Sequence, residues 1–121
     1  MEGKVILVAE DEEFNFLLLK YILEKEGYRV IRALNGVEVL DLFNSGIRID
    51  LIIMDVKMPV MSGLEATIEI RKKNRKLPII ALTAYALPGD REMCMGAGST
   101  DYIPKPIDKT DFLGRVRNLL A

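Results

Sequence analysis

The side chains best suited to chemistry in this sequence are acidic, basic and hydroxyl groups that stand directly after short apolar runs. Five residues have this placement: Glu10, Asp11, Asp55, Thr83 and Lys105. Taken singly, each acidic residue is better explained as a solvated loop residue, and a threonine there as a helix cap. If the runs are neighbouring parallel strands, however, their carboxyl ends meet at one edge of a sheet. The sequence then predicts one site with three carboxylates, a hydroxyl and an ammonium.

Three converging carboxylates need a cation or a shifted pKa. Two like charges a few ångströms apart repel by about 4 kcal/mol at an effective dielectric of about 20. The sequence has no histidine and a single cysteine, Cys94, so the candidate ligands are oxygens. Oxygen ligands favour Mg²⁺ over Zn²⁺, and Mg²⁺ readily shares phosphate oxygens. A metal, a lysine and a threonine beside a carboxylate nucleophile suit phosphoryl transfer.

The elements that must position this site follow a repeated pattern. Short β-branched and aliphatic runs alternate five times with amphipathic segments, which is typical of βα units. The expected strands are residues 4–9, 28–33, 50–54, 78–82 and 101–103. The expected helices carry residues 16–23, 35–46, 64–73, 89–96 and 109–120. Right-handed crossovers place such helices on both faces of one parallel sheet, so we predict a doubly wound α/β fold with one domain over residues 1–121.

Composition and charge exclude several classes of protein. The 121 residues are 50% hydrophobic and 29% charged, which is typical of one globular domain that needs no disulfides. A net charge of -1 argues against direct binding to nucleic acid. The apolar runs are too short to cross a bilayer and the N-terminus has no signal-peptide core, so we expect a cytoplasmic protein without membrane insertion. The basic group at 71–76 is interpreted as the solvated end of a helix.

Four motifs stand in order at the expected strand ends: VILVAED from Val5, IMDVKMP from Ile53, LTA from Leu82 and KP from Lys105. With these motifs the chain resembles the receiver domain of two-component response regulators over essentially its whole length. The amino-acid sequence at residues 58–66 and 81–86 further resembles that of receivers attached to hybrid histidine kinases. The resemblance implies a flavodoxin-like fold with five helices and five parallel strands in the order 2-1-3-4-5.

The resemblance also implies how the acidic residues act. Asp55 would accept a phosphoryl group from a phosphohistidine on a histidine kinase or a histidine phosphotransfer domain. Mg²⁺ would be bound directly by Asp11 and Asp55, through water by Glu10, and by the backbone carbonyl of Lys57. Relatives often have aspartate where Glu10 stands, and glutamate is one methylene longer.

Further roles concern the phosphorylated state. By the same resemblance, Thr83 and Lys105 would contact the phosphoryl oxygens. Tyr102 would be the aromatic switch residue that changes the face built from the fourth helix, fifth strand and fifth helix. Lys57 and Tyr85 each lie two residues beyond a site residue, so we expect them to overhang the phosphoryl group and control the approach of water.

Three alternative functions fit the residues less well. A haloacid-dehalogenase-type phosphatase needs a second acid two residues after its nucleophile, where this chain has Lys57. A dinucleotide-binding domain is suggested by the glycines at 96 and 98, but these precede a predicted strand instead of following one. A pseudo-receiver would lack the acceptor, a metal acid or the lysine, and all are present. We therefore expect no separate enzymatic activity beyond the domain's own phosphorylation and dephosphorylation.

Overall fold

A computed structural model describes residues 3–84 and 87–121. Strands and helices alternate along the chain in five βα units. They are β1 (Val5–Ala9), α1 (Glu13–Glu24), β2 (Arg29–Ala33), α2 (Gly36–Asn44), β3 (Leu51–Asp55), α3 (Gly63–Arg71), β4 (Ile79–Thr83), α4 (Asp90–Ala97), β5 (Asp101–Pro104) and α5 (Lys109–Leu120). The strands are parallel and form one sheet in the order β2-β1-β3-β4-β5, which confirms the predicted topology.

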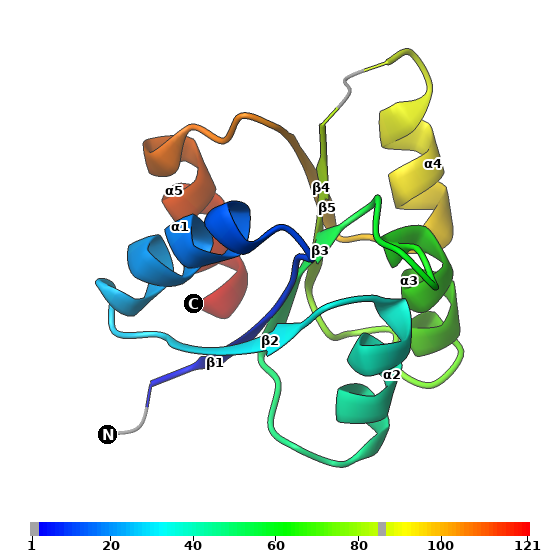
Figure 1. Ribbon diagram of the computed structural model, residues 1–121, viewed down its shortest axis with the longest axis horizontal. Coiled ribbons are helices and arrows are strands. Elements are labelled where there is room, and N and C mark those ends of the chain that lie inside the picture. The colour runs from blue at the N-terminus through cyan, green and yellow to red at the C-terminus, as the bar shows by residue number, and fades with distance from the viewer. Residues whose placement is uncertain (1–2, 85–86) are drawn as a thin grey trace.

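Helices cover both faces of the sheet, with α1 and α5 on one face and α2, α3 and α4 on the other (Figure 1). The alternation of side chains along each strand supplies a core to each face. Ile6 and Val8 of β1 belong to the core with α1 and α5, whereas Leu7 and Ala9 belong to the core with α2 and α3. The central strands are therefore apolar except for Asp55 and Thr83 at the ends of β3 and β4, because both of their faces are buried.

Side-chain caps fix where four of the helices begin, just beyond the carboxyl ends of the strands, and at α5 the Asp108 side chain accepts a hydrogen bond from the Asp111 N–H. The Glu12 side chain accepts a hydrogen bond from the Asn15 N–H at the start of α1, and Asn35 caps α2 in the same way. Ser62 and Glu65 form a reciprocal capping box at the start of α3. The loops that carry the site are consequently short and anchored at both ends.

Several element boundaries differ from the sequence prediction by a few residues. The strands β3 and β4 each end one residue later than expected, at Asp55 and Thr83, because these residues still pair with the neighbouring strands. The first helix begins earlier than the apolar pattern indicated, since the cap at Glu12 sets its start. The helix α3 ends at Arg71, before the expected position 73. Asp55 and Thr83 are thus strand residues, held by the sheet itself.

Within the described residues, no helix combines the length and the apolar character that a membrane span requires.

Candidate functional site

The structure brings Glu10, Asp55 and Lys105 into direct contact at the carboxyl edge of the sheet. The Lys105 ammonium lies 2.9 Å from Glu10 Oε1 and 3.1 Å from Asp55 Oδ2. Glu10 is 1% exposed and Asp55 is 5% exposed, whereas Asp11 beside them is open to solvent. One ammonium is therefore shared by two buried carboxylates, with a third carboxylate at the rim.

The sheet order explains this meeting of residues that are far apart in sequence. The strands β1, β3 and β4 are neighbours, so the residues at their carboxyl ends lie side by side. On the next strand, the Lys105 N–H donates to the Thr83 carbonyl over 2.7 Å, which carries the lysine past the end of β5 and toward the site. The ammonium then reaches back across Thr83 to Asp55 in the middle of the sheet.

Both oxygens of the Asp55 carboxylate accept a hydrogen bond. Oδ1 accepts from the Lys57 N–H over 3.2 Å, and Oδ2 accepts from the Lys105 ammonium. The start of α3 packs closely against the backbone of Asp55. A Cβ atom on Gly63 would lie 2.1 Å from the Asp55 backbone oxygen. Glycine at position 63 therefore lets the start of α3 approach the end of β3.

Burial and charge act in opposite directions on the two partners. Burial raises the pKa of Glu10 above its ordinary value, and the hydrogen bond from Lys105 offsets this only in part because the Asp55 charge is close by. Burial also opposes the charged form of Lys105, but hydrogen bonds to Glu10 and Asp55 outweigh it and raise the pKa of Lys105. The lysine is thus firmly charged, while the acidic group as a whole has an excess of negative charge.

The donor set fits a hard divalent cation. Each of Glu10, Asp11 and Asp55 offers a carboxylate oxygen, and these oxygens lie within 4.8 Å of one another. All three are oxygen donors, which Mg²⁺ prefers. The excess of negative charge beside Lys105 gives a physical reason for a cation to bind. The structure thus brings together the three predicted carboxylate ligands.

The remaining predicted residues have different positions. Thr83 is buried at the end of β4, next to the site, and Lys57 has an exposed position on the loop after β3. Tyr102 is half-buried on β5; burial, followed by the nearby Asp90, Cys94 and Glu92 of α4, raises the pKa of its phenol. The tyrosine therefore belongs to the side of the sheet that carries α4. The predicted Tyr85 lies outside the described residues.

The sequence reasoning missed Arg32, which holds the acidic loop in place. Its guanidinium donates to the backbone oxygens of Glu10 and Asp11 and pairs with Glu13. Arg32 lies on β2, directly beside β1, and its guanidinium also packs 4.3 Å from the centre of the Phe16 ring. The sequence did contain one signal for this role: a basic residue, Arg32, stands next to the end of the otherwise apolar run 30–33.

Comparisons with known proteins identify the family that this chain resembles. The family model described as "Response regulator receiver domain" matches residues 6–117. The polar-differentiation response regulator DivK of Brucella anthropi is 40% identical over 120 residues, which cover 98% of this chain and 97% of that protein. Hybrid signal transduction histidine kinase I of Dictyostelium discoideum is 42% identical over 111 residues, 85% of this chain but 6% of that protein.

A solved structure extends the comparison to the site. The receiver domain of the sensor histidine kinase PA1611 from Pseudomonas aeruginosa has a TM-score of 0.89 and 38% identity, and 98% of each chain is covered. That crystal structure has a magnesium ion coordinated in its active-site cleft.

Proposed function

The chain belongs to the response regulator receiver family of two-component signalling, and from this premise we propose that Asp55 is the residue that accepts the phosphoryl group. The observation that carries the proposal is the Lys105 ammonium, which bridges Asp55 and Glu10 at the carboxyl edge of the sheet. Of the clustered carboxylates, Asp55 ends the central strand β3 and has Lys105 beside it to neutralise charge on an incoming phosphoryl group.

The proposed transfer requires a phosphohistidine on a histidine kinase or a histidine phosphotransfer domain. An Asp55 carboxylate oxygen attacks phosphorus, and the bond between phosphorus and the imidazole nitrogen breaks. The electron pair of that bond returns to the imidazole. Lys105 stabilises the charge that develops on the phosphoryl oxygens, and the Thr83 hydroxyl contacts one of them. The chain thus catalyses its own phosphorylation, and the kinase activity belongs to the partner.

Mg²⁺ is the proposed cofactor of this reaction. Asp11 and Asp55 are the direct ligands, Glu10 acts through water, and the backbone carbonyl of Lys57 completes the protein ligands. The fit of the three carboxylates to a hard cation and the magnesium in the related receiver support this assignment. When bound, the ion neutralises charge on the phosphoryl oxygens.

The signal would leave the site through Thr83 and Tyr102. Once a phosphoryl group is attached to Asp55, the Thr83 hydroxyl gains a charge-assisted hydrogen bond by turning toward it. The side chain of Tyr102 then moves from its half-buried position toward the space beside Thr83. The face formed by α4, β5 and α5 changes with it. The register supports this proposal, because Thr83 and Tyr102 lie on paired strands.

Lys57 and Tyr85 are proposed to set the lifetime of the phosphorylated state. Lys57 follows Asp55 by two residues on the loop above the site, and Tyr85 follows Thr83 by the same interval. Replacement of both by alanine should speed the loss of phosphate from Asp55 without preventing phosphorylation. An unchanged decay rate would show that neither side chain controls the attacking water.

A stripe of exposed apolar side chains lies on α1, next to the site. Its outward side chains Phe14, Leu17, Leu18 and Tyr21 are 64%, 51%, 44% and 60% exposed. Leu18 also lines a cavity of about 340 Å³ that reaches Glu10 and Lys105. We propose that a helix of the partner packs on this apolar stripe, which would bring its phosphohistidine to Asp55.

Two phosphoryl donors, one small molecule and one protein, distinguish phosphorylation of Asp55 from docking of the partner on α1. Acetyl phosphate with Mg²⁺ should phosphorylate the wild type, as seen in the intact mass, and should leave Asp55→Asn unmodified. Leu17→Asp should still react with acetyl phosphate but should lose transfer from a phosphorylated histidine phosphotransfer domain that serves the wild type. Ile68→Asp on α3, 46% exposed in the wild type, is the matched control and should retain both reactions. Full transfer to Leu17→Asp would refute the docking surface.

A further inference from the structure

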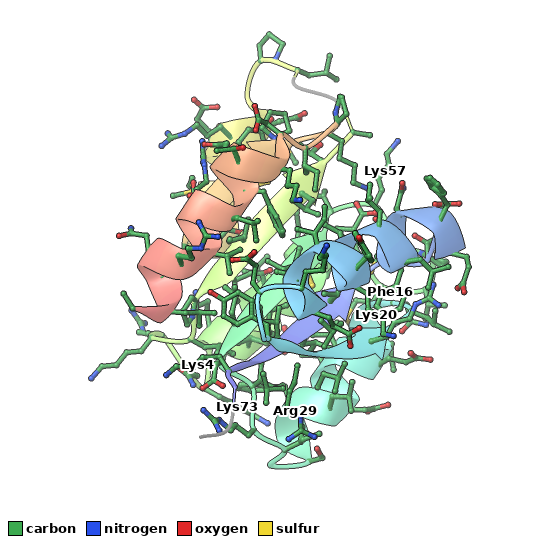
Figure 2. All side chains as sticks on the ribbon, turned by 90° about the vertical axis from the view of Figure 1, so that its left-hand side faces the viewer. Lys4, Phe16, Lys20, Arg29, Lys57 and Lys73 are labelled. Atoms are coloured by element: carbon green, nitrogen blue, oxygen red, sulfur yellow. The ribbon has the colours of Figure 1, made fainter. Side chains whose placement is uncertain are left out.

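Exposed basic side chains gather at the amino ends of four strands, opposite the acidic site. This amino-end rim consists of Lys4, Arg29, Arg48, Lys73, Arg75 and Lys76, all of them exposed. In Figure 2 Lys4, Arg29 and Lys73 lie at the lower end of the molecule, whereas Lys57, on the loop beyond the strand that carries Asp55, lies at the upper right. The rim therefore faces away from the site.

The sheet topology assembles the rim from separate parts of the chain. Lys4 directly precedes β1, and its carbonyl accepts a hydrogen bond from the Arg29 N–H of β2 over 2.9 Å. Arg48 lies just before β3, where the Asp50 N–H donates to the Val5 carbonyl over 2.8 Å. The other three cations occupy the connection from α3 to β4. The basic group noted in the sequence at 71–76 is thus part of a larger surface.

Helix electrostatics explain only part of this surface. Lysine near the carboxyl end of α3 has a favourable interaction with the helix dipole, which accounts for Lys73. Lys4, Arg29 and Arg48 lie at the starts of strands, where this explanation does not apply. Arg71, at the end of α3, is not part of the rim because its guanidinium donates to the Gly98 and Asn74 carbonyls.

The rim has an excess of positive charge that the protein itself does not neutralise. Among the described residues, Arg48 with Asp50 is the single ion pair that a rim residue makes, over 3.0 Å. Lys73 donates to the neutral Asn44 amide. Six positive side chains thus have one acidic partner in a chain whose net charge is -1. The amino-end rim therefore has an excess of positive charge and is complementary to a polyanion.

An apolar element within the rim favours one class of polyanion. A groove of about 220 Å³ is lined by two arginines and four aliphatic residues: Arg29, Arg48, Val5, Val30, Ile31 and Ile47. Ile47 is 44% exposed beside Arg48. A phosphate backbone has no partner for such a side chain, whereas a lipid surface presents apolar atoms just below its anionic headgroups.

We propose that the amino-end rim binds the surface of an anionic phospholipid bilayer. Arg29 and Arg48 contact headgroup phosphates or carboxylates, Ile47 enters the interface between headgroups and acyl chains, and the lysines add long-range attraction. No helix needs to insert. In this orientation the carboxyl edge of the sheet points away from the bilayer, so Asp55 stays open to a partner protein.

Sedimentation with phospholipid vesicles tests the proposal. The chain should partition onto vesicles of phosphatidylcholine with about one-third phosphatidylserine at low salt, and added salt should release it. Each rim cation contributes about fivefold to the partition coefficient. Lys73→Glu with Lys76→Glu should therefore weaken binding by about 25-fold or more.

The matched control reverses two exposed cations outside the rim, Arg91→Glu with Lys109→Glu, and has the same net charge. It should bind vesicles within a fewfold of the wild type. Ile47→Ser should weaken binding while leaving its salt dependence unchanged. Equal losses in the two double variants would overturn the proposal, because net charge alone would then explain binding. Failure of the wild type to bind, or tighter binding to duplex DNA than to vesicles under the same salt, would also overturn it.

Discussion

Replacement of Lys105 by methionine tests whether its ammonium offsets the repulsion between the Glu10 and Asp55 carboxylates. The substitution keeps an unbranched, largely apolar side chain, one atom shorter, but removes the ammonium that Glu10 and Asp55 share. Their carboxylate oxygens lie within 4.8 Å of each other, and two unit charges at that distance repel by about 3.5 kcal/mol at an effective dielectric of about 20. In the absence of metal we therefore expect Lys105→Met to lose about 3.5 kcal/mol of unfolding free energy near neutral pH. This lies at the lower end for breaking a buried ion pair, as suits a lysine that is 21% exposed.

The pH dependence of this loss separates electrostatics from packing. Burial already raises the pKa of Glu10, and removal of the Lys105 hydrogen bond raises it further. A carboxyl group whose folded pKa lies above its unfolded value destabilises the fold as the pH rises through that window. The penalty of Lys105→Met should thus be larger at about pH 7.5 than at about pH 5, because the lower pH favours the protonated, uncharged form of Glu10.

Urea melts in EDTA at these two pH values provide the measurement. Lys109→Met, at an exposed position, is the control and should change stability by less than about 0.5 kcal/mol at either pH. A loss below about 1 kcal/mol for Lys105→Met near pH 7.5 would refute the reasoning. An equal loss at both pH values would show that the lysine acts through packing instead of charge.

Four further substitutions probe other parts of the structure. Asp11→Asn should raise metal-free stability by about 0.5 to 1 kcal/mol and should reduce the stabilisation by added Mg²⁺, as thermal melts can show. Glu26 has a pKa lowered by the Arg117 guanidinium, so Glu26→Gln should be less stable than wild type at neutral pH and equal to it well below pH 4.5, where both side chains are neutral. Gly63→Ala would place a Cβ 2.1 Å from a backbone oxygen of β3 and should cost about 3 kcal/mol in urea melts. Gly114→Ala meets nothing within 4 Å and should instead gain about 0.5 to 1 kcal/mol.

The periodicity of the sequence predicted the fold well because each layer leaves its own pattern. Strands buried on both faces are continuously apolar, and helices repeat every three to four residues, so the five units were recognisable. Their ends were less accurate. Asp55 and Thr83 are polar residues that still pair within the sheet, and hydrophobicity cannot report backbone pairing.

Side-chain partners were the least predictable part of the site. The sequence placed Glu10, Asp55 and Lys105 at one edge, but a single ammonium shared by two buried carboxylates depends on rotamers and on contacts across 95 positions. Arg32 was missed for a similar reason. Its guanidinium donates to backbone oxygens of the loop that follows β1, and the sequence does not show which backbone oxygens a side chain will reach. The amino-end rim was only partly visible, since its cations come from four separate segments.

The most direct test of the central claim is to locate the phosphoryl group on the chain. After reaction with acetyl phosphate and Mg²⁺, sodium borohydride reduces an aspartyl phosphate to homoserine, and tandem mass spectrometry then identifies the modified position. We predict homoserine at position 55 in the wild type, and its absence when acetyl phosphate is withheld or EDTA is in excess. Homoserine at position 11, or trapping at position 55 that is equally strong in excess EDTA, would contradict the account.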